Sequence, residues 1–293
     1  MILIAIAVLL WVVAFVRLAR WAASPALSPS LGAAIVLSSL AARVTLFNVP
    51  ALSEWLDNVT SWPNLATLAQ LLFLVSATAG AQIVVIGLIP EIGSPGRIVR
   101  YMLALGLVVA VLVTVLFAAA GRRSRLSVYE YASEYSADGW IAGAFLLTIG
   151  YGATGCVAIT TISIRTLRRS GSRWRPQLLL LAIGSGLFAC YALSRAALIW
   201  ASRVDKHWSV RPVFDAGSAI AAVACVLVVI GLTWESAGAV VRAWRYLKRS
   251  QALFAQIDLV APDMTKQADR VAGWSVTRRA EARSVAILDF LTL

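Results

Sequence analysis

Seven long apolar runs, separated by short polar segments, dominate the pattern of this chain. They cover residues 2–19, 27–47, 64–89, 101–120, 139–163, 177–200 and 214–234. A helix that crosses a bilayer needs about 20 mainly apolar residues, so each run is long enough to span a membrane. The pattern predicts an all-α, multi-pass protein of the cell membrane, with a seven-helix transmembrane bundle over 1–236 and a short helical tail over 237–293.

The composition indicates that lipid, not water, surrounds most of the chain. Hydrophobic residues make up 60% of the sequence, and the mean hydropathy is +0.82. Soluble domains hold about 45–50% apolar residues, and a much larger apolar surface aggregates in water. The segments between the runs are too short to hold a second core, so only the tail has room for a separate unit.

The basic residues predict the orientation of the bundle. The chain has 26 Lys and Arg against 14 Asp and Glu, a formal net charge of +12. Most Lys and Arg fall on inner segments if the N-terminus lies outside and the C-terminus lies in the cytosol, as the positive-inside rule requires. The main exception is the basic cluster at 122–125, which this topology places outside. Because topology explains the charge, we expect no nucleic-acid partner.

Signatures of catalysis and of metal binding are absent from the sequence. It contains no Gly-rich phosphate loop and no His-Glu-x-x-His, and its single histidine is His207. Cys156, Cys190 and Cys225 fall inside predicted spans without the spacing of metal ligands. The sequence therefore predicts neither an enzyme nor a cofactor or metal site.

A few polar side chains near the outer ends of the spans are the candidate ligand-binding residues. Charged groups at bilayer depth are costly and tend to face a bundle interior or a cavity. Arg43, Arg195 and Asp215 lie at a similar outer depth, and Gln70 lies in the outer third of its helix. Tyr191 is four residues before Arg195, so these two share one helical face.

Two interpretations of these residues stay open at this point. In the first, they line an outward-open pocket, in which the two arginines hold an anionic group and Asp215 is the resting counter-ion of one of them. Alternatively, both arginines extend to the outer lipid headgroups and bind no ligand. Asn64, which opens the third span, and the deeper Gln82 are predicted to form polar contacts between helices.

The tail begins with a basic amphipathic segment over 238–256. Apolar residues recur at helical spacing, and basic residues occupy the positions between them. Such a helix is expected to lie on the anionic inner leaflet, or to continue the seventh helix and pack on a partner. A second short helix is predicted over 273–293. The apolar positions are Val240, Val241, Trp244, Leu247 and Phe254, and the basic ones are Arg242, Arg245, Lys248 and Arg249.

Six stretches of the chain match a known pattern, namely 63–66, 81–82, 129–135, 174–176, Tyr191 to Arg195, and 253–262. Through them the chain resembles an uncharacterised actinobacterial family of seven-helix integral membrane proteins that are labelled transporters. The resemblance covers nearly the whole chain, although Ala252 and Phe254 replace the Pro and Trp of the family pattern. It implies the same fold and transport of a small solute.

Two functions are compatible with these features. The first is transport of a small anionic or amphipathic solute. The alternative is a sensory or regulatory module, in which a ligand biases the positions of the helices and a cytoplasmic protein binds the tail. A scaffold without a ligand is a third possibility.

Overall fold

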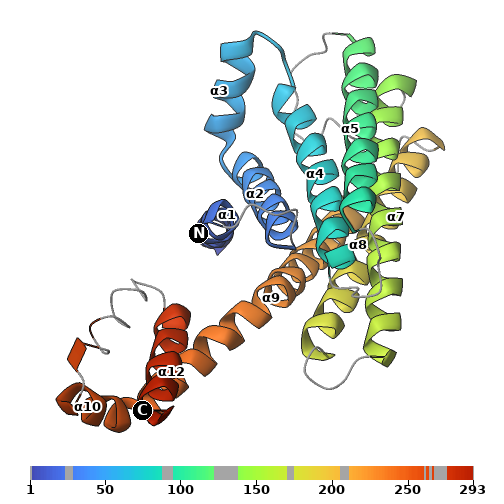
Figure 1. The fold of residues 1–293 in the computed structure, drawn as a ribbon. Coiled ribbons are helices and arrows are strands. Elements are labelled where there is room, and N and C mark those ends of the chain that lie inside the picture. Colours follow the sequence, from blue (N-terminus) through green and yellow to red (C-terminus); the bar gives the residue numbers. More distant parts are fainter. Residues whose placement is uncertain are drawn as a thin grey trace. The chain divides into compact units, whose positions relative to one another are not determined.

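The protein is helical throughout the part that its structure describes. The computed structural model describes residues 2–23, 29–87, 95–121, 138–169, 175–204, 211–260, 262–263, 266 and 276–292. Every regular element within these ranges is a helix, which confirms the all-helical prediction (Figure 1). The chain divides into two compact units, Met1–Val229 and Ile230–Leu293.

Five helices are long and apolar enough to cross a membrane. They are α2 (Pro29–Asn48), α4 (Leu65–Gly87), α5 (Pro95–Ala119), α7 (Gly139–Arg169) and α8 (Arg175–Val204). The first and seventh predicted spans fall in α1 (Ile2–Ala23) and α9 (Arg211–Arg249). Their described apolar stretches, Ala7–Ala19 and Ala219–Trp234, are shorter. The chain is therefore a helical, membrane-type protein, and the number of seven spans stays a prediction.

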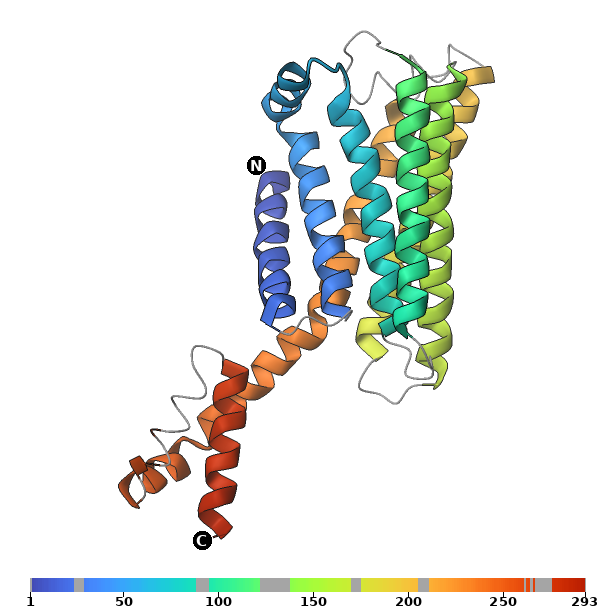
Figure 2. The same cartoon turned by 45° about the horizontal axis from the view of Figure 1, so that its top comes forward.

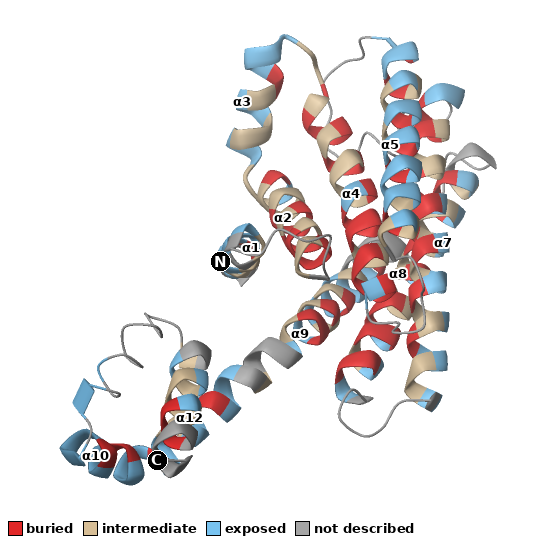
Figure 3. Ribbon diagram, viewed as in Figure 1, coloured by how far each residue is buried: buried red, intermediate tan, exposed pale blue. Residues whose placement is uncertain are grey.

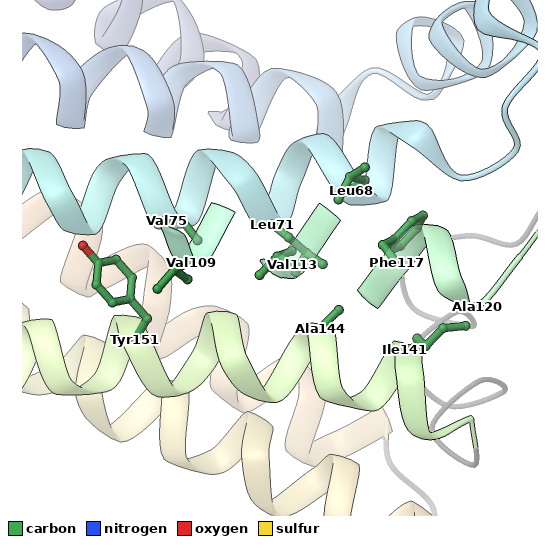
Figure 4. Close-up of a cluster of buried hydrophobic side chains, with 10 residues drawn as sticks. All are labelled: Leu68, Leu71, Val75, Val109, Val113, Phe117, Ala120, Ile141, Ala144 and Tyr151. Carbon is green, nitrogen blue, oxygen red and sulfur yellow. The ribbon is translucent and has the colours of Figure 1, made fainter. Parts of the chain in front are cut away.

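Helix α4 lies in the centre of the first unit and packs against α2, α5 and α7 (Figure 2). On one side of α4, a buried apolar cluster joins it to α5 and α7 (Figure 4). The opposite side of α5 is exposed and apolar, as in Leu107, which is 66% exposed (Figure 3). A helix with exposed apolar residues on its outer side suits a lipid surrounding. The buried cluster comprises Leu68, Leu71, Val75, Val109, Val113, Phe117, Ala120, Ile141, Ala144 and Tyr151.

A pair of glycines lets α2 and α4 approach each other closely. A Cβ atom added to Gly32 would lie 2.7 Å from the carbonyl oxygen of Gly80. A Cβ atom on Gly80 would lie 2.8 Å from the carbonyl oxygen of Gly32. Small residues at such a crossing are the usual way in which membrane helices bring their backbones together. Gly143 of α7 (Gly139–Arg169), by contrast, is not in such close contact, since among the described residues an added Cβ would lie nearest to Leu116, at 3.7 Å.

The segment 48–63, between the second and third predicted spans, contains a helix that the hydropathy pattern missed. Helix α3 (Pro50–Thr60) has Pro at its start and ends at Ser61 in the left-handed conformation. Asp57 is the buried residue of α3 and accepts two backbone hydrogen bonds, from the N–H groups of Asn64 and Ala66, each at 3.1 Å. Its carboxylate thus caps the beginning of α4, where unpaired N–H groups favour a negative charge.

Replacing Asp57 by Ala is expected to destabilise the bundle by about 1–3 kcal/mol, because two buried N–H groups lose their acceptor. Thermal unfolding of the purified protein in detergent measures the effect. Glu54→Ala is the matched control, because Glu54 is an exposed carboxylate on the same helix. Equal unfolding temperatures for the two variants would show that the Asp57 cap contributes nothing.

The second unit is built from the end of α9 and two shorter helices, α10 (Gln251–Val260) and α12 (Val276–Thr292). Phe254 and Ile257 of α10 pack against Ala286 and Ile287 of α12 in a small core. Helix α9 continues without a break through the boundary predicted at 236–237. The sequence predicted that Phe254 shares an apolar stripe with Trp244 on one helix. In the structure Phe254 lies on α10 and belongs to this small core.

Candidate functional site

Three of the predicted ligand-binding residues meet in the first unit. Arg43 of α2 and Arg195 of α8 both lie close enough to Tyr191 to interact electrostatically with its hydroxyl group. The guanidinium carbon of Arg195 also lies 4.9 Å from the centre of the Tyr191 ring. This second contact follows from the four-residue spacing on one helix. The approach of Arg43 is a tertiary contact, which brings two cations from different helices to one phenol.

Helix α9 forms a wall beside these residues. A Cβ atom added to Gly217 would lie 3.4 Å from Oγ of Ser194 and 3.5 Å from Cδ2 of Tyr191. Ala224 follows Gly217 by seven residues on α9 and lies next to Gly184 of α8. A Cβ atom added to Gly184 would lie 3.1 Å from the carbonyl oxygen of Ala224. Small residues thus hold α8 and α9 in close antiparallel contact from Gly184 to Tyr191.

Cys225, on the same stretch of α9, lies within electrostatic range of Arg43. Residues of α2, α8 and α9 therefore lie near one another in this part of the first unit. Sequence reasoning missed the contributions of Ser194, Gly217 and Cys225. The small residues Gly217 and Ala224, seven positions apart on one helix, were the available signal.

Gln70 of α4 is buried at the same level of the bundle as Arg43. It is 5% exposed, and its Nε2 atom has no hydrogen-bond partner within the described part of the chain. From the Gly32–Gly80 crossing, Arg43 is eleven residues along α2 and Gln70 is ten residues back along α4. Both positions are therefore about 15 Å from that crossing, in antiparallel helices.

An apolar groove between α1, α2, α3 and α4 is further evidence that Arg43 and Gln70 lie at the same depth in the bundle. It is lined by residues that neighbour Arg43 on α2 and Gln70 on α4 in sequence. No direct contact between Arg43 and Gln70 is observed among the described residues. The lining comprises Trp11, Ala42, Thr45, Leu46, Leu52, Leu56, Leu65, Leu68, Ala69, Leu72 and Phe73.

The remaining predicted site residues lie elsewhere or outside the description. The side chain of Asp215, two residues before Gly217 on α9, is outside the described residues. Asn64 lies at the junction of α3 and α4, where its N–H group donates to Asp57. Gln82 links two helices, because its Oε1 atom accepts a hydrogen bond of 3.3 Å from the hydroxyl of Tyr151 on α7. The basic cluster at 122–125, which the predicted topology places outside the cell, is not among the described residues.

The convergence of Arg43 and Arg195 favours the binding of an anion. Two like charges repel each other most strongly where water is scarce, and an anion between them would relieve this repulsion. A guanidinium group presents a planar fork of donors that matches carboxylate and phosphate oxygens. Both arginine side chains are half-buried, so such an ion would be partly shielded from water.

Other chemistry finds no support in the geometry that is described. No group of three or more His, Cys, Asp or Glu side chains in the described ranges is placed to hold a metal ion. Cys156, Cys190 and Cys225 are free thiols. Within the described part of the first unit, the arginine–tyrosine cluster brings two cations and a hydroxyl group together, which suits recognition of an anion.

Comparisons with protein-family models, with curated proteins and with solved structures find no match for this chain.

Proposed function

We propose that this protein is a seven-helix membrane protein that transports a small anionic or amphipathic solute across the cell membrane. Its N-terminus lies outside the cell and its C-terminus in the cytosol. The observation that carries this proposal is the convergence of Arg43 and Arg195 on Tyr191, within helices of membrane-spanning length. The resemblance to seven-helix transporters, stated above from short sequence stretches, agrees with it.

The direction of the arginine side chains argues against simple extension to the headgroups. A side chain that extends to the membrane surface holds its cation in water and away from the bundle. Arg43 and Arg195 instead approach the hydroxyl of Tyr191, and so each other. Arg43 is five residues before the end of α2, and Gln70 is five residues after the start of α4. Both therefore lie about 7 Å below the helix ends, at a depth that a solute can reach from outside.

The donors at this level favour an oxyanion as the solute. The two guanidinium groups and the Tyr191 hydroxyl suit the oxygens of a carboxylate or a phosphate. The unpartnered amide nitrogen of Gln70 supplies a neutral donor for a further acceptor on the solute. In this proposal, the Asp215 carboxylate is the resting counter-ion that the solute displaces.

A sensory or regulatory module is the second candidate. The second unit has its own apolar core of Phe254, Ile257, Ala286 and Ile287, which gives a cytoplasmic partner protein a folded surface to bind. In this alternative the anion binds at the same arginines and is not carried across the membrane.

Uptake by proteoliposomes distinguishes the two functions. The purified protein is reconstituted and exposed to a mixture of small carboxylates, phosphate esters and inorganic phosphate, and the vesicle contents are analysed by mass spectrometry. Accumulation of an anion is expected for wild type and for Arg165→Ala, which removes an exposed arginine of α7. Arg195→Ala is expected to lose it.

The other outcomes decide between the alternatives. A thermal shift with an anion but no accumulation would favour the sensory module. Accumulation that is unchanged in a well-folded Arg195→Ala variant would contradict the proposed site.

A further inference from the structure

The last turns of α9 in the second unit have two different faces. One face is covered, since Ala243 and Ser250 are buried and Leu247 is half-buried. The other face exposes four cations, namely Arg242, Arg245, Lys248 and Arg249. At 100° per residue these four fall within one third of the helix circumference. The helix therefore presents a basic face, which we call the basic face of α9 and on which Val241 lies between Arg245 and Lys248.

Apolar groups adjoin this basic face. Trp244 is 57% exposed and Val241 is 45% exposed, and the ammonium group of Lys248 lies 5.6 Å from the centre of the Trp244 ring. A large exposed aromatic ring beside cations is unfavourable in plain water. It is the usual composition of a surface that sits at the level of lipid headgroups, where Trp meets the acyl boundary and Lys or Arg meets phosphate.

The position along the chain puts the basic face close to the membrane surface. The apolar stretch of α9 ends at Trp234, and the first exposed cation, Arg242, follows eight residues later. Eight helical residues extend about 12 Å, and the headgroup region on each side of a bilayer is about 5–8 Å deep, so Arg242 follows within a few ångströms of the headgroups along the helix. Clusters of basic residues directly after a transmembrane helix bind anionic leaflets, and each contributes measurably to the affinity.

We infer that the basic face of α9 binds the phosphate headgroups of anionic phospholipids in the inner leaflet. Trp244 and Val241 insert at the boundary with the acyl chains. This inference rests on the membrane orientation proposed above but not on the anion site at Arg43 and Arg195. It makes the state of the second unit sensitive to the anionic lipid content of the membrane.

Fluorescence in lipid nanodiscs tests this binding in the full-length chain. Cys156, Cys190 and Cys225 are replaced by Ala, and Gln251→Cys, at an exposed position next to the basic face, carries a polarity-sensitive dye. The discs contain either phosphatidylcholine alone or equimolar phosphatidylcholine and phosphatidylglycerol. A blue shift of the dye emission is expected only with phosphatidylglycerol, and high salt is expected to reverse it.

Charge variants distinguish lipid binding by the basic face of α9 from a nonspecific effect of the positive charge of the second unit. The double variant Arg245→Gln/Lys248→Gln is expected to lower the ratio of membrane-bound to unbound second unit roughly 30-fold. The factor corresponds to the loss of two cations that each contribute about 1 kcal/mol to membrane binding. The matched control is Lys266→Gln with Arg279→Gln, which removes two exposed cations elsewhere in the second unit and should keep the shift.

Three results would each overturn the inference. The first is equal emission in the two kinds of disc, and the second is an equal loss of the shift in both pairs of charge variants. The third is a shift that requires an added soluble protein and not anionic lipid, which would assign the face to a protein partner. Anion binding measured on the protein that keeps its native cysteines reports on Arg43 and Arg195 separately, so the two proposals can fail independently.

Discussion

Replacing either Arg43 or Arg195 by Ala is expected to weaken the binding of a small carboxylate or phosphate roughly 10–100-fold. Each substitution removes a charge-assisted contact to the anion, and such contacts contribute about 1.5–3 kcal/mol. The fold should survive, because removal of one of two converging cations also relieves their repulsion. Isothermal titration calorimetry of the purified protein measures the affinity, with inorganic phosphate and a panel of mono- and dicarboxylates as probes.

Arg195→Lys sharpens this prediction. Lysine keeps the positive charge but lacks the planar fork of donors, so we expect an affinity between those of wild type and Arg195→Ala. The matched control is Arg165→Ala, an exposed arginine on α7, which should bind as wild type does. Equal affinities for wild type and a folded Arg43→Ala/Arg195→Ala double variant would refute the anion site.

The second large effect is expected at the crossing of α2 and α4. Gly80→Ala places a methyl group 2.8 Å from the carbonyl oxygen of Gly32 and 2.9 Å from Cγ2 of Ile35. Backbone atoms cannot yield as a flexible side chain does, so the two helices must separate. The expected cost is about 1–3 kcal/mol, as for other overpacked cores. Thermal unfolding in detergent measures it.

Gly150→Ala is the control for Gly80→Ala. Gly150 also lies within a long helix, α7, but its added Cβ has no atom within 4 Å among the described residues. There the gain in helix propensity should stabilise the protein by up to about 1 kcal/mol. If both variants unfold at the same temperature, the Gly32–Gly80 crossing does not govern the packing of α2 against α4.

Hydropathy predicted the long helices because each is a single run of apolar residues. It missed α3, because the segment 48–63 is too polar to form such a run. A helical signal was nevertheless present there, since Pro50 stands at the first position and Leu52, Leu56 and Val59 recur at spacings of four and three. The role of Asp57 as a cap for α4 depends on the turn at Ser61 and Asn64, which a pattern of hydropathy does not contain.

The sequence predicted how far the site residues lie from the helix ends, but not which of them face one another. The positions of Arg43 and Arg195 relative to their helix ends follow from counting residues. Whether they share a side of the bundle depends on how α2, α8 and α9 rotate and cross. Those rotations are fixed by close contacts such as Gly184 with Ala224, which a single sequence does not reveal. The local pair of Tyr191 and Arg195 was predictable, because both residues belong to one helix.

The orientation of the chain in the membrane is the claim on which the outward position of the arginines depends. Labelling of intact cells with a membrane-impermeant maleimide measures it directly, in a chain whose native cysteines are replaced by Ala. Two single-cysteine variants suffice, both at exposed positions: Glu54→Cys on α3 and Gln251→Cys on α10. The account predicts labelling at position 54 in intact cells, and at position 251 only after permeabilisation. Labelling at position 251 but not at 54 in intact cells would contradict it.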